Sequence, residues 1–274
     1  MRAIESNDEI KHIQLDILLA FHQFCMENDL KYSLAAGSLI GAVRHHGFIP
    51  WDDDIDVYLM RDDYKRLITL FPDKYQKYFS LVTSERDNNW HRPFGKLYDN
   101  RTLEIESTRN KYQEQGMGID IFPIDEVPDN IDEWLKFEKR RRLLRDISSM
   151  KSLLYSNKRS LAKNLLMFVC RLLLSPLSFS YLSKLTDKYA QLHNGKGYKH
   201  VYENCPGVYN SKHPWLKDDF EEVIDASFEG HTVKIMRGYD DYLTTVYGDY
   251  MKLPPKEKQV SHHDFKAYWK AEEC

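Results

Sequence analysis

Hydrophobic residues in the N-terminal segment recur at steps of three and four positions, which places them on one side of a helix. The stripe consists of Ile10, Ile13, Ile17, Phe21 and Phe24. Ser6, followed by Glu9 three positions later, predicts a capping box at the start of this helix. Asn28 and Asp29 are expected to end it. The segment is therefore predicted to be an amphipathic helix.

Polar and apolar residues alternate over residues 54–59, which predicts a half-buried strand. On this strand Asp54, Asp56 and Tyr58 would share one face. A helix over about 62–71 should follow. Further strands are expected at 32–35, 79–83, 93–98 and 118–122, a short helical run at 39–44, a hairpin from 220–228 into 232–236, and a final helix at 239–246.

From residue 131 to about 193 the pattern becomes helical. We therefore expect an α/β (α+β) fold, in which a small mixed sheet is surrounded by helices. Its predicted organisation is a catalytic core at 1–130, a basic helical lobe at 131–200, and a C-terminal segment at 201–274 that completes the core.

Composition indicates a globular enzyme rather than a disordered or nucleic-acid-binding chain. The 274 residues are 42% hydrophobic and 30% charged, and the formal net charge is −3. The four cysteines lie far apart in sequence, so no C-x-x-C zinc or redox motif is present. No secretory signal is visible at the N-terminus, so we expect a cytoplasmic protein.

Carboxylates are concentrated at residues 52–54 and at Asp56, and Asp120 lies on a similar predicted strand. Two carboxylates that are two residues apart on one strand point the same way and can share a hard divalent cation. The expected ion is Mg²⁺, or Mn²⁺ in its place. The alternative for residues 52–54 is a solvated turn before the strand.

Gly37 and Ser38 precede these carboxylates at a strand-to-helix junction, where backbone N–H groups can receive a phosphate. Taken alone, a Gly-Ser pair is weak evidence. Together with the acidic-apolar strands around Asp56 and Asp120 it forms the pattern of nucleotidyltransferase-type folds, although the interval from Ser38 to Asp54 is longer than in most of them.

Three longer segments resemble the LicD family. They are AAGSLIGAVRHHGFIPWDDDIDV at 35–57, GIDIFPID at 118–125, and YLTTVYGDYMKLPP at 242–255 followed by His262. The resemblance spans nearly the whole chain and is least specific in the helical middle. It implies a nucleotidyltransferase-like core, with Asp54 and Asp56 as the metal pair, Asp120 as the third carboxylate, and Gly37 and Ser38 at the phosphate-side turn.

Other side chains in these segments are candidates for substrate binding. Arg44 is a candidate for holding phosphate, against a surface salt bridge, and Lys96 for neutralising the leaving group, against a solvated face. Asp125 and Asp52 are candidates for supporting or base roles. His262 is a further candidate base, against a surface histidine, and Trp51 is either a pocket wall or a buried loop anchor.

The resemblance implies metal-dependent transfer of phosphocholine from CDP-choline to a hydroxyl of a cell-surface glycan, either free or lipid-linked, with release of CMP. Teichoic acid, lipopolysaccharide and capsule precursors are the expected acceptors. One alternative is transfer of ribitol or glycerol phosphate from a CDP-alditol. The others are nucleotidyl transfer and a non-catalytic scaffold for polysaccharide assembly, and the intact set of three carboxylates argues against the scaffold.

A choline donor requires aromatic faces for its quaternary ammonium, whereas an alditol requires several hydroxyl partners. Aromatic residues near the three segments are Trp51, Tyr58, Phe94, Tyr98, Phe122 and Tyr247. Because core packing also explains aromatic residues, this observation favours choline only weakly.

The middle of the chain is strongly basic. Between Lys136 and Arg171 there are 11 Lys and Arg residues and only two acids. An apolar run at 164–174 lies beside this charge and is too short to span a bilayer. It predicts either an interfacial helix on an anionic membrane, at the inner face of the plasma membrane, or a helix that packs its apolar stripe on the core. No nucleic-acid-binding motif accompanies the charge.

Overall fold

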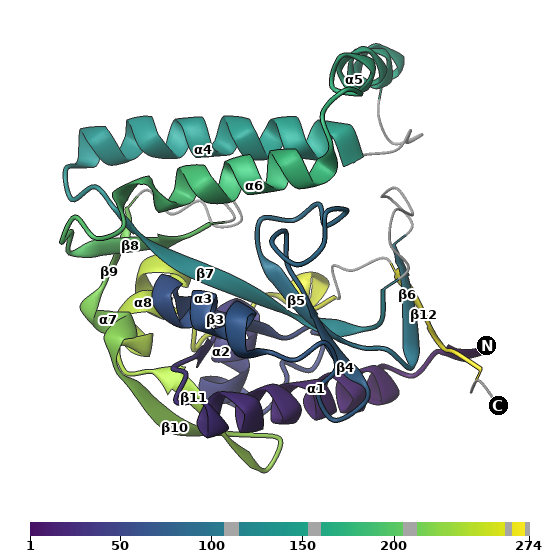
Figure 1. The fold of residues 1–274 in the computed structure, drawn as a ribbon. Coiled ribbons are helices and arrows are strands. Elements are labelled where there is room, and N and C mark those ends of the chain that lie inside the picture. Colours follow the sequence, from purple (N-terminus) through teal and green to yellow (C-terminus); the bar gives the residue numbers. More distant parts are fainter. Residues whose placement is uncertain (107–114, 153–159, 205–212, 261–264, 272–274) are drawn as a thin grey trace.

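The computed structural model describes residues 1–106, 115–152, 160–204, 213–260 and 265–271. Its centre is a mixed sheet in the order β2-β3-β7-β5-β4, with β8 beside β7 and β9 beside β8 (Figure 1). The strands are β2 (Ser33–Leu34), β3 (Asp56–Met60), β4 (Phe79–Val82), β5 (Gly95–Asp99), β7 (Gly118–Val127), β8 (His200–Glu203) and β9 (Trp215–Leu216). The expected mixed α/β architecture is confirmed.

The long strand β7 organises this sheet. It runs parallel to β3 along one side, while its other side pairs first with β5 and then with β8. It extends five residues beyond the predicted end at 122, because β8, from distant sequence, hydrogen-bonds to its second half. Helix α3 (Arg61–Leu70) follows β3, close to the predicted range.

The prediction that Asp54 lies in a strand with Asp56 was wrong. Ladder pairing of β3 begins at Asp56, and Asp54 belongs to the preceding loop. The loop diverges from the sheet because helix α1 (Asn7–Glu27) holds it, with Gln14 Nε2 donating to the carbonyl of Asp53 over 2.8 Å.

Helix α1 lies against the sheet and buries the predicted stripe from Ile13 to Phe24. Its predicted capping box does not form, because Ser6 makes no side-chain capping bond. Glu9 instead accepts hydrogen bonds from Arg2 and from Trp269 Nε1. Glu9 thereby links the start of α1 to strand β12 (Phe265–Trp269).

Strand β12 belongs to a small second sheet in the order β1-β12-β6, with β1 at Arg2–Ile4 and β6 at Thr102–Glu106. In this sheet the C-terminal strand β12 lies between the N-terminal strand β1 and β6. The predicted hairpin is confirmed as β10 (Val223–Phe228) and β11 (His231–Met236), and the final helix as α8 (Tyr239–Tyr247). Shorter helices are α2 (Ala36–Ile40), a π-helix at Gly41–His45, α7 (Asp218–Glu221), η2 (Gln191–His193) and η3 (Lys256–Lys258).

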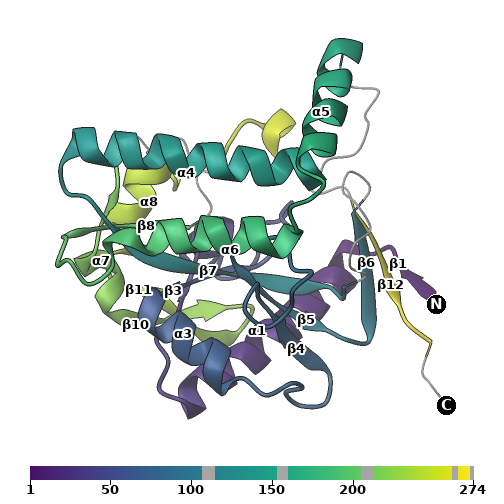
Figure 2. The same ribbon diagram turned by 45° about the horizontal axis from the view of Figure 1, so that its top comes forward.

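The helical middle consists of α4 (Ile131–Ser152), α5 (Leu161–Leu173) and α6 (Phe179–Ala190). Helices α4 and α6 lie side by side over β7 and β8 (Figure 1), whereas α5 projects away from the body beyond the end of α4 (Figure 2). None of the helices in the described ranges is long and apolar enough to cross a membrane.

Candidate active site

Asp56 and Asp120 lie directly opposite each other in the parallel pairing of β3 and β7. Residues in register on adjacent strands project from the same face, so the two carboxylates are neighbours about 5 Å apart at their backbones. Lys96 is opposite Asp120 on the other side, in β5. The structure thus brings together two of the three predicted metal ligands, although Asp120 is far from Asp56 in sequence.

The two carboxylate oxygens of Asp120 have different surroundings. Oδ2 accepts a hydrogen bond from Arg92 Nη1 over 3.1 Å, and this ion pair is largely buried. Oδ1 is buried and has no hydrogen-bond partner among the described residues. A buried carboxylate oxygen without a partner is costly, which makes Oδ1 a candidate ligand for a cation.

The loop before β3 adds more carboxylates. Asp52, Asp53 and Asp54 can each place one oxygen within 4.8 Å of the other two. Helix α1 holds the backbone of this loop. Lys11 Nζ donates to the carbonyls of Ile49 and Pro50, and Gln14 donates to the carbonyl of Asp53. The third predicted ligand, Asp54, therefore lies in a loop whose backbone is held in place.

Gly37 and Ser38 pack directly against the acidic segment. A Cβ atom on Gly37 would lie 2.6 Å from Asp52 Oδ2, so only glycine allows this carboxylate to approach the backbone so closely. Ser38 Oγ accepts a hydrogen bond from the backbone N–H of Asp56 over 2.9 Å. Both residues position the carboxylates, and their predicted contact with phosphate stays a prediction.

The surroundings of Asp56 disfavour the ionised form of its carboxyl group. Burial is the largest cause that raises its pKa well above the ordinary value, followed by the negative charges of Asp54, Asp120, Asp52 and Glu203. Glu203 is itself buried, and burial raises its pKa from 4.5 to about 8. By register Glu203 faces Ile124, so it shares the face of β7 that carries Asp120.

These observations suit a hard divalent cation. The carboxylates converge, one buried oxygen has no partner, and like charges outnumber the basic groups beside them. All ligand atoms on offer are oxygens, which Mg²⁺ and Mn²⁺ prefer. The group of oxygens within 4.8 Å of one another belongs to Asp52, Asp53 and Asp54, and the ligand set of Asp54, Asp56 and Asp120 stays a prediction.

Two predicted basic groups have protein partners. Arg44 donates to the carbonyls of Tyr250 and Lys252, over 2.5 and 3.4 Å, and thereby joins the 35–57 segment to the 242–255 segment. It forms a backbone contact rather than a surface salt bridge. Lys96 is buried, not solvated, and pairs with Glu104 Oε2 over 2.9 Å. Their contact with a substrate stays a prediction.

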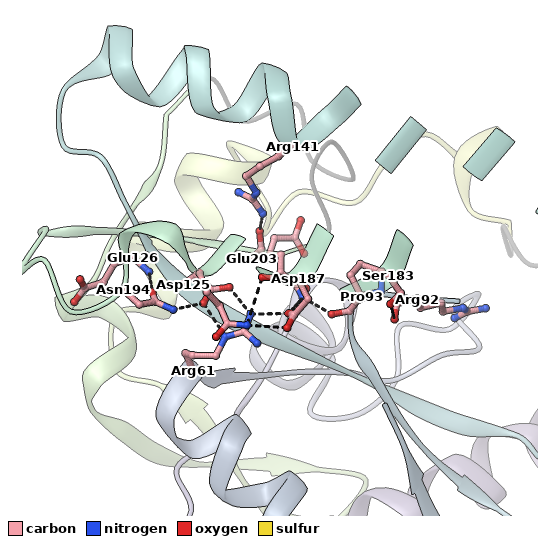
Figure 3. Close-up of polar contacts among 12 residues, drawn as sticks. Arg61, Arg92, Pro93, Asp125, Glu126, Arg141, Ser183, Asp187, Asn194 and Glu203 are labelled. Carbon is pink, nitrogen blue, oxygen red and sulfur yellow. Dashed lines mark hydrogen bonds and ion pairs between the residues drawn. The ribbon is translucent and has the colours of Figure 1, made fainter. Parts of the chain in front are cut away.

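Asp125 lies away from the acidic cluster. It is five residues from Asp120, so strand alternation turns it to the other face of β7. There it accepts hydrogen bonds from Arg61 Nε and Nη2 and from Asn194 Nδ2 (Figure 3). Asp187 of α6 also pairs with Arg61, at 3.0 Å. The structure does not bring Asp125 to the metal ligands, so its position does not support the predicted substrate contact.

Helix α6 also contacts the segment that carries Arg92. Ser183 Oγ donates to the carbonyl of Arg92 over 2.5 Å, and Asn204 Nδ2 donates to the carbonyl of Pro93 and to Asp187 Oδ1 (Figure 3). Arg92 thus connects the helical lobe to Asp120. Sequence reasoning missed Arg92 and Glu203; the one available signal for Arg92 was its place just before the strand that carries Lys96.

The aromatic candidates fall into two groups. Tyr58, Phe94 and Phe122 are buried and pack together, with the rings of Phe94 and Phe122 4.4 Å apart. Trp51 is half-buried against the core and its ring is nearly perpendicular to that of His45, Tyr98 is half-buried, and Tyr247 is exposed. Only this second group has the exposure that a ligand needs. His262 lies outside the described residues.

Comparison with known proteins shows the family of this chain. The model of the family described as LicD/FKTN/FKRP, nucleotidyltransferase domain, matches residues 29–167. The lipopolysaccharide cholinephosphotransferase LicD of Haemophilus influenzae is 36% identical over 263 residues, which cover 93% of this chain and 94% of that protein. An uncharacterized protein of Rickettsia prowazekii is 38% identical over 68 residues, 25% of each chain. The matched family segment contains Asp54, Asp56, Arg92 and Asp120.

Proposed function

The chain belongs to the LicD family, and we propose that it transfers phosphocholine from CDP-choline to a hydroxyl group of a cell-surface glycan, with Mg²⁺ as cofactor. The observation that carries the chemistry is the in-register pair Asp56 and Asp120 with its partnerless oxygen, Asp120 Oδ1. The near full-length similarity to a lipopolysaccharide cholinephosphotransferase supports the transferred group and suggests lipopolysaccharide as the class of acceptor.

The proposed reaction exchanges one phosphorus–oxygen bond for another. The acceptor hydroxyl oxygen attacks the phosphorus that bears choline, and the bond from that phosphorus to the bridging oxygen breaks. CMP leaves with the bonding electrons, and the hydroxyl proton passes to a base. Asp52 is our candidate for this base, because it lies in the acidic cluster and Asp125 does not.

Asp54, Asp56 and Asp120 would hold the metal, which when bound neutralises phosphate oxygens and favours departure of CMP. Arg92 is the basic side chain already directed at this place, since it contacts Asp120. A guanidinium there can donate to a phosphate oxygen of the donor and orient it for in-line attack. The close approach at Gly37 and the Ser38 bond to Asp56 hold the carboxylates in position.

The donor is tested by incubating the protein with Mg²⁺ and CDP-choline, CDP-ribitol or CDP-glycerol in separate reactions, and measuring CMP. We expect CMP from CDP-choline that increases with a glycan acceptor and ceases in excess chelator. Turnover of CDP-ribitol with CDP-choline inert would replace choline by an alditol. If the protein instead releases pyrophosphate from CTP, and no CMP from the CDP-linked donors, the reaction would be nucleotidyl transfer.

The acceptor is tested separately, with the donor held constant. Lipopolysaccharide, teichoic acid and capsule precursors are offered in parallel, and labelled phosphocholine is followed into each product. Incorporation into lipopolysaccharide alone is the expected result. Full CMP release in chelator would contradict the role of the metal. No release from any CDP-linked donor with any acceptor would contradict the proposed chemistry and leave the scaffold alternative.

A further inference from the structure

Helix α5 exposes an unusual amount of apolar surface. None of its 13 residues is buried. Seven of its apolar side chains are between 43% and 78% exposed: Leu161, Leu165, Leu166, Phe168, Val169, Leu172 and Leu173. The core-packing alternative for this segment was therefore wrong. Contiguous apolar surface of this kind on a protein marks an interaction site.

The helix is well formed at both ends. Ser160 caps the first turn by accepting from the N–H of Lys163, and the N–H of Leu174 donates to Cys170 at the last turn. Lys151, near the end of α4, donates to the carbonyls of Leu174 and Leu177. These bonds attach the exit of α5 to α4 and leave the rest of α5 projecting from the body (Figure 2).

The two sides of α5 differ in polarity. At 100° per residue, the exposed apolar residues occupy one continuous arc of the helix. Lys163, Asn164 and Arg171 occupy the opposite side. Asn164 and Arg171 are half-buried, and burial together with the charge of Arg171 lowers the pKa of Lys151 in α4. Asn164 and Arg171 therefore face the protein, whereas Lys163 and the apolar side are exposed.

Charge identifies the occupant of this surface. The 40 residues from 147 to 186 contain six Lys and Arg residues and no Asp or Glu, in a chain whose net charge is −3. An apolar ridge in a segment of one charge sign is complementary to a surface that is both apolar and anionic. An anionic lipid bilayer has both properties, since basic residues bind its headgroups while apolar side chains enter the acyl boundary.

We propose that α5 docks the protein on an anionic membrane, with Leu165, Phe168 and Leu172 inserted at the interface. At 1.5 Å per residue its 13 residues extend about 20 Å, so it lies along the surface rather than crossing the bilayer. This inference goes beyond the proposed chemistry and does not depend on it.

Sedimentation with vesicles tests the proposal. We expect the protein to bind vesicles of phosphatidylcholine and phosphatidylglycerol, to bind pure phosphatidylcholine much less, and to be released by salt. The variant L165S/F168S/L172S should lose at least about tenfold in affinity. The matched control L70S/L216S removes exposed leucines from α3 and β9, away from α5, and should bind as the unchanged protein does.

A second measurement reports insertion directly. In F168W, lipids brominated near the headgroup end of the acyl chain should quench tryptophan fluorescence beyond the quenching seen in the parent protein. The variants L165S/F168S/L172S and L70S/L216S should both still release CMP with a soluble acceptor. Loss of membrane binding is therefore separable from loss of catalysis.

Two outcomes would overturn the proposal. One is binding to anionic vesicles that is absent, or unchanged in L165S/F168S/L172S. The other is concentration-dependent dimerisation in sedimentation velocity that this variant abolishes and vesicles do not disturb, which would assign α5 to an interface between two copies of this chain.

Discussion

Carboxylates on the two sides of β7 meet opposite environments. On one face, Asp125 and Asp187 share the guanidinium of Arg61, and Asn194 supplies a further hydrogen bond. On the other, Asp120 pairs with Arg92 beside Asp52, Asp54 and Asp56. Burial, followed by the charges of Asp54, Asp120 and Asp52, raises the pKa of Asp56. The first group carries its counterion within the fold. The second has an excess of negative charge, which is the property of a site that binds a cation.

The network around Arg61 and the acidic cluster therefore have different roles. A network with its own counterion stabilises the fold and gains nothing from an added ion. A crowded set of like charges lowers stability until a cation arrives, so its presence indicates function. Substitutions on the two faces should therefore affect different quantities.

The largest effect is expected from the acidic cluster. Asp54→Asn, Asp56→Asn and Asp120→Asn should each lower turnover by about 10³-fold or more, because positioned charge at the phosphate supplies most of the acceleration. Without metal the Asp54 and Asp56 variants should unfold at the same temperature as the parent or higher, since repulsion is relieved, whereas Asp120→Asn also loses the ion pair with Arg92. CMP release and thermal melts in chelator measure both. An active Asp56→Asn would remove this face from the mechanism.

Breaking the opposite face should affect stability instead. Arg61→Leu leaves Asp125 and Asp187 buried without their cation, which should lower the free energy of unfolding by about 3–5 kcal/mol. Asp125→Asn should cost less, because Arg61 retains Asp187. Urea denaturation measures the loss, and turnover per folded molecule should change little. A variant of normal stability that lacks activity would contradict the structural role.

The sequence predicted the acidic cluster better than the network around Arg61, for a physical reason. Alternating residues around Asp56 and Asp120 are a local signal, and they predicted the two strands and the shared site. Where Asp54 leaves the sheet depends on Gln14 in another helix, and the environment of Asp125 depends on Arg61 and Asp187 from distant segments. The pairing of β6 with β12 likewise joins residues far apart in the chain. No local pattern encodes such contacts.

Arg92 offers a way to sharpen the comparison, because it is the basic residue that contacts Asp120. Arg92→Gln should lower kcat/KM by roughly 10- to 100-fold, as expected for loss of a hydrogen bond to a charged group. If the guanidinium competes with the metal for Asp120, Mg²⁺ should bind this variant more tightly, as titration calorimetry would show. Ser183→Ala, which removes a contact to the Arg92 carbonyl, is the matched milder change. Unchanged kinetics together with unchanged metal affinity would leave Arg92 a structural residue only.

The smallest effect concerns Glu203, which faces the acidic side of β7 from β8. Burial raises its pKa from 4.5 to about 8, so the folded protein binds its proton more tightly than the unfolded chain does. The resulting stabilisation is complete below pH 4.5 and is lost as pH rises through about 8. Glu203→Gln keeps the neutral shape and removes this titration. The variant should therefore match the parent near pH 5 and melt at a higher temperature near pH 9. Parallel melting curves for the two proteins across this whole range would show that Glu203 does not hold a proton in the folded state.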